Sequence, residues 1–589
     1  MHDAKEGTVA PDGQIAIAKV TAAAPAPLPR TVAASLAGSA LQWSAFLCFA
    51  AAALLWLGPY LWRVDLVSED STQHVFWFWR WVDAAFLTSD LAADYFSSSA
   101  VAPLGYRSLY AIVVPFVGPQ LAGELVAIAL LALSCGLAWM LGTSLGEKRS
   151  ELRGLLAVVA TLALIAMPRP DLLSPMGFQR SFALPITLLV LWALVARRYA
   201  WVGVGWLGAA LFYPVIVPVL GLAGAAVLLF ETLRERRLPR AWPWNALAGV
   251  AAIAIVLTNA VPLDWVGPQV TLEQARAMPE FGPGGRLDMS ARSSPGFWIR
   301  DHRYGIGWPI ATLGLFALAS VFTRLAGRSV GNAKQIPMPA WMLAGAGLLL
   351  FAISHLTLFH LYLPNRHTRT SIAAFGIVAI VIAVSLLVQR MRGSVEDTRT
   401  NRVIALIAPV AVTLLFLPLG LQLWRQPVNE DLERMYVAIG SLPTDAVVAA
   451  HPDLANYVTL RTGRSVLASS ETALPFMPGF YDRMKPRFVA SLRAAHAPDW
   501  NSLSADLATF AVHVVLLGPT PALPGLDAPF SAMERGLEQR ATLGQLLVDL
   551  PPEHVIARSG PYALVQLEER KPEILQARLP ARTRAGKTQ

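Results

Sequence analysis

Long apolar runs recur along the chain, and most of them match the thickness of a lipid bilayer. A membrane-spanning helix needs about 20 consecutive apolar residues. Because lipid offers no hydrogen-bond partners, each run must pair its backbone groups internally, which favours helices packed as a bundle. The runs cover residues 41–62, 121–145, 152–167, 181–196, 201–230, 244–261, 306–322, 341–363, 372–388 and 403–424.

Composition agrees with a membrane protein and excludes two other classes. Hydrophobic types make up 55% of the 589 residues and charged types only 15%, against about 25% charged in a soluble domain. This excludes a plain soluble enzyme and a mainly disordered chain. Cys48 and Cys135 both lie in apolar runs, so neither a disulfide framework nor a cysteine zinc site is expected. The net charge of +9 indicates cytoplasmic loops and no nucleic-acid partner.

The run at 201–230 decides the number of spans. As one helix it would be about 45 Å long, against a hydrocarbon core of about 30 Å, and Tyr213-Pro214 offers a break. If every basic cluster faces the cytoplasm, this run must cross twice. That predicts about eleven transmembrane helices with a cytoplasmic N-terminus. The basic clusters lie at 148–153, 197–198, 234–240, 324–334 and 390–402.

The last third of the chain predicts a separate α/β domain outside the membrane. Its charges are more frequent and nearly balanced, and short strand-like runs alternate with helical patterns. At about 150 residues it can bury its own core. We therefore expect a polytopic α-helical membrane protein with a C-terminal extracytoplasmic α/β domain. Its parts are a disordered cytoplasmic tail (1–38), a transmembrane domain (39–424) with outward loops at 63–120 and 264–305, the α/β domain (425–575) and a basic disordered tail (576–589).

The first outward loop places acids directly after the first span. Asp65, Glu69 and Asp70 precede one aromatic helix that contains His74 and Arg80, and such a helix is expected to lie at the membrane surface. A carboxylate at its start would face water at the bilayer boundary, where a lipid-borne and a polar substrate can meet. The alternative is that these acids only cap helices.

Arginines gather in two further outward segments. Arg366, His367 and Arg369 occupy a short turn between two spans, and Arg300 and Arg303 precede another span. Arginine contacts phosphate in a bidentate manner and stays protonated. The interpretation is a clamp on a lipid phosphate. Headgroup anchoring or an ion pair with an acid of the first loop is the alternative.

In the C-terminal part, His451 and Asp453 follow a predicted strand. Loops at the ends of strands often carry binding groups. A turn with a helix cap at Asp453 is the simpler interpretation of these two residues.

The whole arrangement resembles the GT-C superfamily of integral-membrane glycosyltransferases. The resemblance rests on Glu69-Asp70 after the first span, the aromatic segment behind it and the outward tail. The turn Leu363-Pro-Asn-Arg-His-Thr is similar to a Leu-Pro-Ser-Arg-Tyr-Thr turn of bacterial membrane proteins of this type, and residues 442–452 and 462–467 resemble two strands of oligosaccharyltransferase tails. The Trp-Trp-Asp-Tyr-Gly run of oligosaccharyltransferases is absent, so the acceptor stays open.

The resemblance implies transfer of a sugar from a polyprenyl-phosphate donor, with inversion, to a glycan, lipid or protein acceptor outside a bacterial inner membrane. Asp70, with Glu69 as the substitute, would be the general base, and Arg366 and Arg369 would hold the departing phosphate. His74, His367, Arg300 and Arg303 are further candidate substrate-binding residues. No cofactor is expected. If a divalent cation takes part, the nearest ligands are Asp65, Glu69, Asp70 and His74.

Two other functions stay open at this point. The same arginines would serve a transporter or flippase of a lipid-linked glycan, which needs a polar pathway through the spans. A non-catalytic scaffold for envelope assembly would need neither Asp70 nor Arg366.

Overall fold

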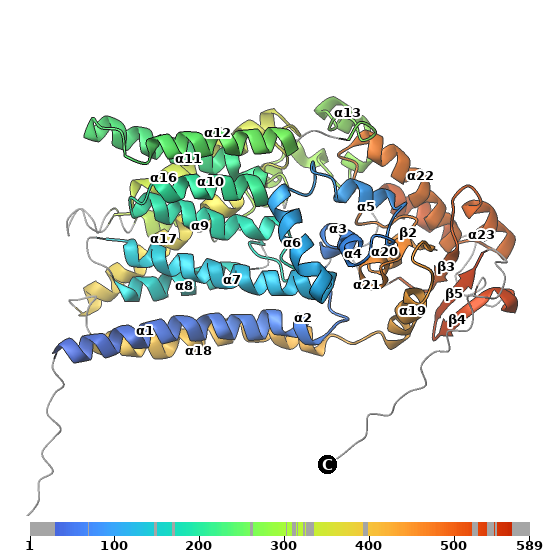
Figure 1. Ribbon diagram of the computed structural model, residues 1–589, viewed down its shortest axis with the longest axis horizontal. Helices are drawn as coiled ribbons and strands as arrows, with labels where there is room; N and C mark the ends of the chain where they lie inside the picture. The colour runs from blue at the N-terminus through green and yellow to red at the C-terminus, as the bar shows by residue number, and fades with distance from the viewer. Residues whose placement is uncertain are drawn as a thin grey trace, which may run out of the picture.

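Helices form one end of the molecule and a small sheet lies at the other (Figure 1). The structure is a computed structural model, and seven of its helices are long and apolar enough to cross a membrane. It describes residues 30–68, 70–146, 150–167, 171–259, 263–301, 303–308, 312, 314, 316–321, 324, 335–392, 398–520, 528–538, 547 and 550–567.

The seven candidate spans confirm a helical membrane protein. They are Ser39–Trp62, Pro119–Ser144, Pro214–Glu235, Trp242–Asn259, Met338–Leu356, Asn365–Arg390 and Arg399–Arg425. They belong to α1 (Arg30–Ala52) with η1 (Ala53–Leu57) and α2 (Gly58–Trp62), then α7 (Pro119–Ser144), α11 (Val217–Glu235), α12 (Trp242–Asn259), α16 (Met338–Leu356), α17 (Asn365–Arg392) and α18 (Thr398–Arg425).

Shorter helices complete the bundle. They are α6 (Leu104–Val117), α8 (Glu151–Ile165), α9 (Ala183–Val195) and α10 (Ala200–Phe212). Three of them, α8, α9 and α10, coincide with predicted runs, whereas α6 falls in the predicted outward loop. The run at 306–322 lies largely outside the described residues, so the count of eleven spans stays a prediction.

The long run at 201–230 is two helices, as Tyr213-Pro214 predicts. Helix α10 ends at Phe212, a short turn η4 (Pro214–Ile216) follows, and α11 begins at Val217. Proline has no N–H to continue the ladder of α10, so the helix ends just before it. The break leaves the ring of Tyr213 near the charged cluster described below.

Glycines let neighbouring helices of the bundle approach closely. A Cβ at Gly142 of α7 would lie 2.3 Å from the Arg153 carbonyl oxygen of α8, and one at Gly420 of α18 would lie 2.6 Å from that of Leu55. Because backbone atoms cannot move aside as a side chain can, only glycine fits at these contacts. Helix α7 thus packs closely on α8, and η1 packs closely on α18.

The aromatic segment after the first span differs from its prediction. In place of one helix at the membrane surface, the chain forms α3 (Ser71–His74), η2 (Phe76–Phe78) and α4 (Trp79–Val82). Phe76, Trp77 and Phe78 are buried, and Phe78 packs on Tyr110 of α6 with ring centroids 4.4 Å apart. The prediction of a surface helix was wrong because α6, an apolar helix inside the same loop, covers these rings.

The C-terminal region contains a five-stranded mixed sheet with the order β2-β1-β3-β5-β4. Strands β1 and β2 and strands β1 and β3 pair in parallel, while β3 with β5 and β5 with β4 are antiparallel. The strands are β1 (Val447–Ala450), β2 (Ser465–Val466), β3 (Val514–Leu517), β4 (Val555–Ser559) and β5 (Tyr562–Gln566). The strands predicted from the sequence are residues 446–450, 465–468, 513–517 and 562–567, which match β1, β2, β3 and β5, whereas β4 lies outside them.

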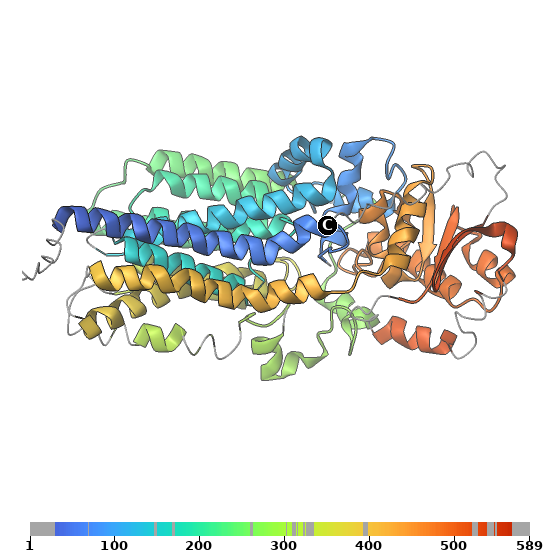
Figure 2. The ribbon, with the colours of Figure 1, turned by 90° about the horizontal axis from the view of Figure 1, so that it is seen from below.

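Helices cover both faces of this sheet. One apolar cluster joins the sheet to α19 and α21, and another joins it to α22 and α23. The helices are α19 (Glu430–Gly440), α20 (Pro452–Ala455), α21 (Val458–Thr462), α22 (Pro478–Ala495), α23 (Trp500–Leu507) and α24 (Ala528–Glu538). Figure 2 shows this region at the end of the bundle. The predicted limits of the domain, 425 and 575, remain predictions.

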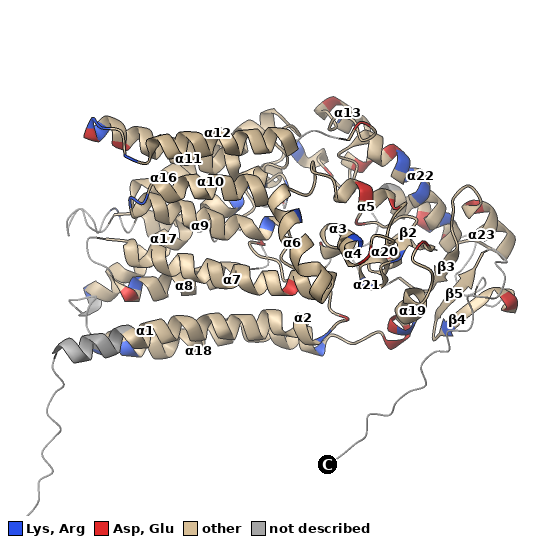
Figure 3. Ribbon diagram, viewed as in Figure 1, with Lys and Arg blue, Asp and Glu red and all other residues tan. Residues whose placement is uncertain are grey.

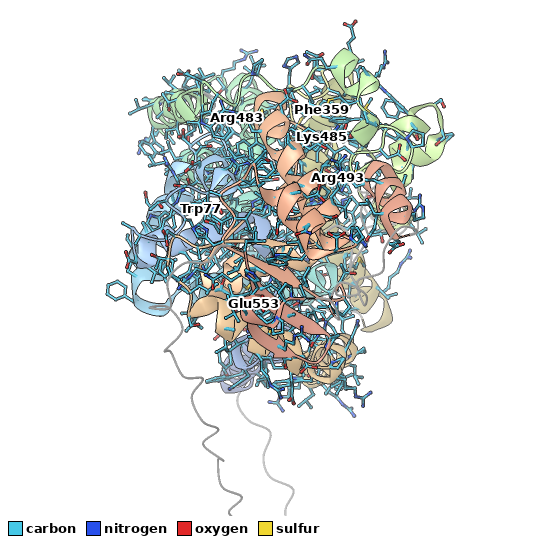
Figure 4. All side chains as sticks on the ribbon, turned by 90° about the vertical axis from the view of Figure 1, so that its right-hand side faces the viewer. Trp77, Phe359, Arg483, Lys485, Arg493 and Glu553 are labelled. Atoms are coloured by element: carbon cyan, nitrogen blue, oxygen red, sulfur yellow. The ribbon has the colours of Figure 1, made fainter. Side chains whose placement is uncertain are left out.

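Helix α22 fastens the sheet region to the loops at the end of the bundle. Phe480 stacks on Tyr95 of α5 (Leu91–Phe96) at a centroid distance of 4.3 Å. Glu280, in η5 (Pro279–Phe281), accepts hydrogen bonds from Tyr481 (2.9 Å) and Lys485 (2.7 Å). Figure 4 views this end and labels Lys485 on α22. The two predicted loops and the C-terminal region therefore form one body.

Candidate active site

A chain of alternating charges lies where the helix bundle meets the loops. The Asp70 carboxylate pairs with the Arg180 guanidinium, which also contacts Asp171 at 2.6 Å. Asp171 in turn contacts Arg369 at 3.5 Å. The Arg180 side chain is 15% exposed and that of Asp70 is 38% exposed, so the arginine is held inside while the carboxylate stays open to a substrate.

Helix α6 positions two of the segments that carry this cluster. The hydroxyl of Tyr106 donates to the His74 carbonyl (3.3 Å), and that of Tyr110 donates to the Gly177 carbonyl (2.7 Å). The first bond fixes α3 behind Asp70, and the second fixes the segment that leads into η3 (Gln179–Phe182), which carries Arg180. Gly177 has a φ of +57°, a conformation that glycine adopts without strain.

Among the described residues, Arg366 makes no ion pair. It lies in the first turn of α17, three residues before Arg369, and contributes a positive charge to the surroundings of Asp70. Its Nε and Nη1 are buried and have no hydrogen-bond partner among the described residues. A buried donor without a partner costs about 1–3 kcal/mol, and more when it is charged. The site therefore favours an anion beside Arg366.

His74 is a neutral member of the site. The His74 ring stacks on the Phe178 ring at a centroid distance of 5.2 Å. The Arg180 guanidinium lies 4.6 Å from the centre of the Phe178 ring. Burial, with Arg180 and Arg366 nearby, lowers the pKa of His74 to about 4, although Asp70 acts against this shift. His74 is thus uncharged at neutral pH and adds no positive charge to the cluster.

Asp70 is ionised at neutral pH. Burial alone would raise the pKa of its carboxyl, but the charges of Arg180 and Arg366 lower that pKa below its ordinary value. The cluster contains three positive charges, on Arg180, Arg366 and Arg369. It contains two negative charges, on Asp70 and Asp171. This surplus of positive charge suits a bound anion such as a phosphate.

Two residues of the cluster hold uncommon backbone conformations. Asp171 has a φ of +56° and Tyr362 a φ of +62°, in the left-handed region that residues with a side chain seldom adopt. Burial raises the pKa of Tyr362, which lies near Arg366 and Tyr213. Strained backbone of this kind concentrates at functional sites, and both residues lie in the same cluster.

The structure brings together Asp70, His74, Arg366 and Arg369 from the predicted set. Arg303 is close, because it adds positive charge around Arg366, and it donates to the Arg286 carbonyl. Glu69 lies outside the described residues, and so does the side chain of Arg300 at the end of α14 (Pro295–Arg300).

Other candidates of the sequence have structural bonds. The His367 ring bonds the Leu361 carbonyl at 3.1 Å and so holds the turn before α17; its contact with a substrate stays a prediction. Asp65 pairs with Arg63, whose guanidinium also donates to the Leu423 carbonyl. Asp65 thus ties the first span to α18 and points away from the cluster.

The divalent cation considered from the sequence does not suit this cluster. The carboxylate of Asp70 is occupied by Arg180, and a cation would lie among guanidinium groups. Among the described residues, the three side chains gathered at metal-binding distances are His451, His496 and Glu534, which belong to the C-terminal region.

Arg180 and Asp171 are the site residues that the sequence analysis missed. They belong to the short outward connection between the predicted spans 152–167 and 181–196. The rule that drew attention to Arg366, a charged residue in an outward turn between two spans, would have selected Arg180 as well.

Comparison with known proteins gives similar structures but no similar sequences. No family model and no curated protein matches the chain. The apo oligosaccharyltransferase of Archaeoglobus fulgidus aligns at a TM-score of 0.43 with 11% identity, over 82% of this chain and 69% of that one. ArnT from Cupriavidus metallidurans, bound to undecaprenyl phosphate, aligns at 0.46 with 14% identity, over 92% of this chain and 99% of that one. These similarities concern the path of the chain, and the arguments below rest on its own side chains.

The low pKa of His74 predicts a pH-dependent stability. An unfolded histidine has a pKa near 6.5, so between about pH 6.5 and pH 4 the unfolded chain binds a proton that the folded one does not. Falling pH therefore destabilises the fold by at most about 1.4 kcal/mol per pH unit through this group. We expect the drop in unfolding midpoint from pH 7 to pH 5 to be smaller for His74→Gln than for the wild type. His554→Gln is the control, and equal drops in the wild type and His74→Gln would disprove the assignment.

Proposed function

We propose that this protein is a membrane glycosyltransferase that moves a sugar from a polyprenyl-phosphate donor to an acceptor outside the cytoplasm. The observation that carries the proposal is Arg366, whose buried Nε and Nη1 have no hydrogen-bond partner among the described residues and whose charge acts on the ionised carboxylate of Asp70. Arg366 would stabilise the anionic leaving group, and Asp70 would accept the proton of the acceptor. The acceptor is a glycan, a lipid or a protein with a reactive hydroxyl.

The arginines serve the phosphate of the donor. Arg366 has two buried nitrogens free to donate among the described residues, and Arg369 lies one helical turn further along α17. Both stand near the beginning of a candidate span that starts at Asn365, so a lipid tail can stay in the bilayer while its phosphate reaches them. Arginine donors that are already in place stabilise the negative charge that grows on the departing phosphate.

Asp70 serves the acceptor. In a single displacement, the acceptor oxygen forms a bond to the anomeric carbon as the bond from that carbon to the phosphate oxygen breaks. The acceptor proton moves to Asp70, and the bonding electrons leave with the phosphate, which Arg366 and Arg369 neutralise. One displacement inverts the configuration at the sugar carbon. This step uses no metal, in line with the poor fit of a cation to the cluster.

The orientation of the protein follows from its charges. Figure 3 shows arginines and lysines at the end of the bundle opposite to the sheet region. They include Arg153 at the start of α8, Arg234 at the end of α11 and Arg390 near the end of α17. By the positive-inside rule this end faces the cytoplasm of a bacterial inner membrane, so the cluster and the sheet lie outside.

Replacing Asp70 by Asn tests the base. Loss of general-base catalysis costs about 10²- to 10⁴-fold in rate, so we expect release of polyprenyl phosphate from a radiolabelled polyprenyl-phosphate sugar to fall by that factor. The matched control is Asp94→Asn, an acid of the same loop that is 47% exposed and paired with Arg80, which should retain full turnover. Normal turnover in Asp70→Asn would refute the catalytic role and favour a transporter or a scaffold.

Replacing Arg366 by Gln tests the phosphate contact independently. Charge-assisted hydrogen bonds contribute about 1.5–3 kcal/mol, so affinity for a polyprenyl monophosphate should fall about 10- to 100-fold. Binding is measured by titration of the purified protein in detergent. Arg198→Gln, just past the end of α9 that is opposite to Arg180, is the control. Asp70→Asn removes a negative charge and should bind at least as tightly as the wild type. Unchanged affinity in Arg366→Gln would exclude the phosphate site.

Cysteine labelling on intact cells tests the orientation. Cys48 and Cys135 are buried and should not react with a maleimide. The labelling of a variant with one introduced cysteine therefore reports on that cysteine alone. Glu553→Cys, on the sheet region (Figure 4), should react with a membrane-impermeant maleimide. Arg240→Cys, after α11, should react only once the membrane is permeabilised. The reverse pattern would place the sheet inside the cell and contradict the proposal.

A further inference from the structure

Three potential metal ligands meet in the C-terminal region, away from the Asp70 cluster. His451 follows strand β1, His496 follows helix α22, and Glu534 lies in helix α24. The His451 Nε2 is 2.9 Å from the Glu534 Oε1, and the His496 Nε2 is 3.6 Å from the same oxygen. One ligand atom from each residue lies within 4.8 Å of the other two.

His496 has no hydrogen bond that explains its place. Both of its ring nitrogens are buried without a partner among the described residues, although the side chain is 12% exposed. The distance of 3.6 Å to Glu534 is too long for a hydrogen bond. A buried polar ring without a partner is costly, and its open nitrogen faces the other two ligands.

From this geometry we propose that His451, His496 and Glu534 bind one zinc ion. Two imidazole nitrogens and a carboxylate oxygen form a donor set that suits zinc, and a fourth position is left for water or another ligand. Tetrahedral zinc with bonds of about 2.0–2.2 Å holds its ligand atoms about 3.4 Å apart. The present spacing needs only small side-chain rotations to reach this value.

The hydrogen bonds of His451 indicate which of its ring nitrogens would bind the ion. Its Nδ1 accepts a long hydrogen bond (3.3 Å) from the Asp453 backbone N–H, so its Nε2 carries the proton and donates to Glu534. Zinc would take the place of that proton at Nε2; the proton moves to Nδ1, which keeps the ring neutral and gives up its long hydrogen bond from the Asp453 N–H. The Asp453 carboxylate is beside it, and its Oδ1 is buried without a hydrogen-bond partner. A carboxylate behind a ligating histidine is a common second partner in zinc sites.

The ion would fasten α24 to the rest of the molecule. Phe530 of α24 packs on Phe488 of α22 at a centroid distance of 4.3 Å, and α24 also contacts η5 in the second loop. Glu534 is the residue of α24 that reaches both histidines. A bound zinc would therefore join α24 to the ends of β1 and α22, in addition to the Phe488–Phe530 contact and the hydrogen bond between His451 and Glu534.

Metal analysis of the full-length protein in detergent tests this site. The protein is purified with a tag that contains no histidine, stripped with a chelator, dialysed against zinc and assayed by elemental mass spectrometry. We expect one zinc per chain and a higher unfolding midpoint with zinc than without it. Glu534→Gln keeps an oxygen that can accept the His451 hydrogen bond but lacks the charge that zinc needs.

We expect Glu534→Gln and His496→Ala to lose the bound zinc and the zinc-dependent rise in midpoint. Glu538→Gln, on the same helix, and His554→Gln, in the same region, should keep both. Cobalt in place of zinc should give the absorption of a tetrahedral site in the wild type and none in Glu534→Gln. Zinc binding that is absent in the wild type, or equal in Glu534→Gln and the wild type, would overturn the proposal and leave a hydrogen bond between His451 and Glu534 only.

Discussion

The ion pairs of Arg180 with Asp70 and Asp171 are the interaction on which the site depends. Arg180 enters from the connection before α9, Asp70 from the loop after the first span, and Asp171 links the pair to Arg369 on α17. Three parts of the sequence are thus linked through Arg180 and Asp171. Because the Arg180 side chain is mostly buried, loss of its carboxylate partners would leave its charge uncompensated, so these ion pairs help to hold the three elements in place.

The charge balance of this network limits what it can bind. Arg180 is paired with two carboxylates and Arg369 shares one of them, while among the described residues the buried Nε and Nη1 of Arg366 and the Nε of Arg180 have no partner. A second cation would face repulsion, and a neutral ligand would leave Arg366 unsatisfied. An anion with several oxygens can accept hydrogen bonds from Arg366 and balance its charge. The candidate span that begins at Asn365 places that anion at the lipid boundary, where a phosphate on a lipid is the simplest candidate.

Much of this arrangement was predictable from local sequence rules, and the rest was not, for physical reasons. Tyr213-Pro214 marked the helix break because proline acts on its own neighbours. Asp70 is a candidate because it opens the loop after the first span, and Arg366 because it lies in an outward turn between two spans. The rings of Phe76 and Phe78 are predicted at the membrane surface, since nothing local reveals that other segments of the same loop cover them. The rule that selects Arg366 also fits Arg180, but its pairing with Asp70, and that of Asp171 with Arg369, joins residues more than 100 positions apart, which no local rule predicts.

The ion pair between Asp70 and Arg180 also affects when Asp70 can act as a base. With Arg180 in contact, its pKa lies below the ordinary value, and a carboxylate this acidic takes up a proton reluctantly. A phosphate that enters beside Arg366 also attracts Arg180 and adds negative charge near Asp70. Both effects raise the affinity of Asp70 for a proton, since a like charge nearby disfavours the ionised carboxylate. On the proposed function, donor binding would thus prepare the base, and the empty site would keep it inactive.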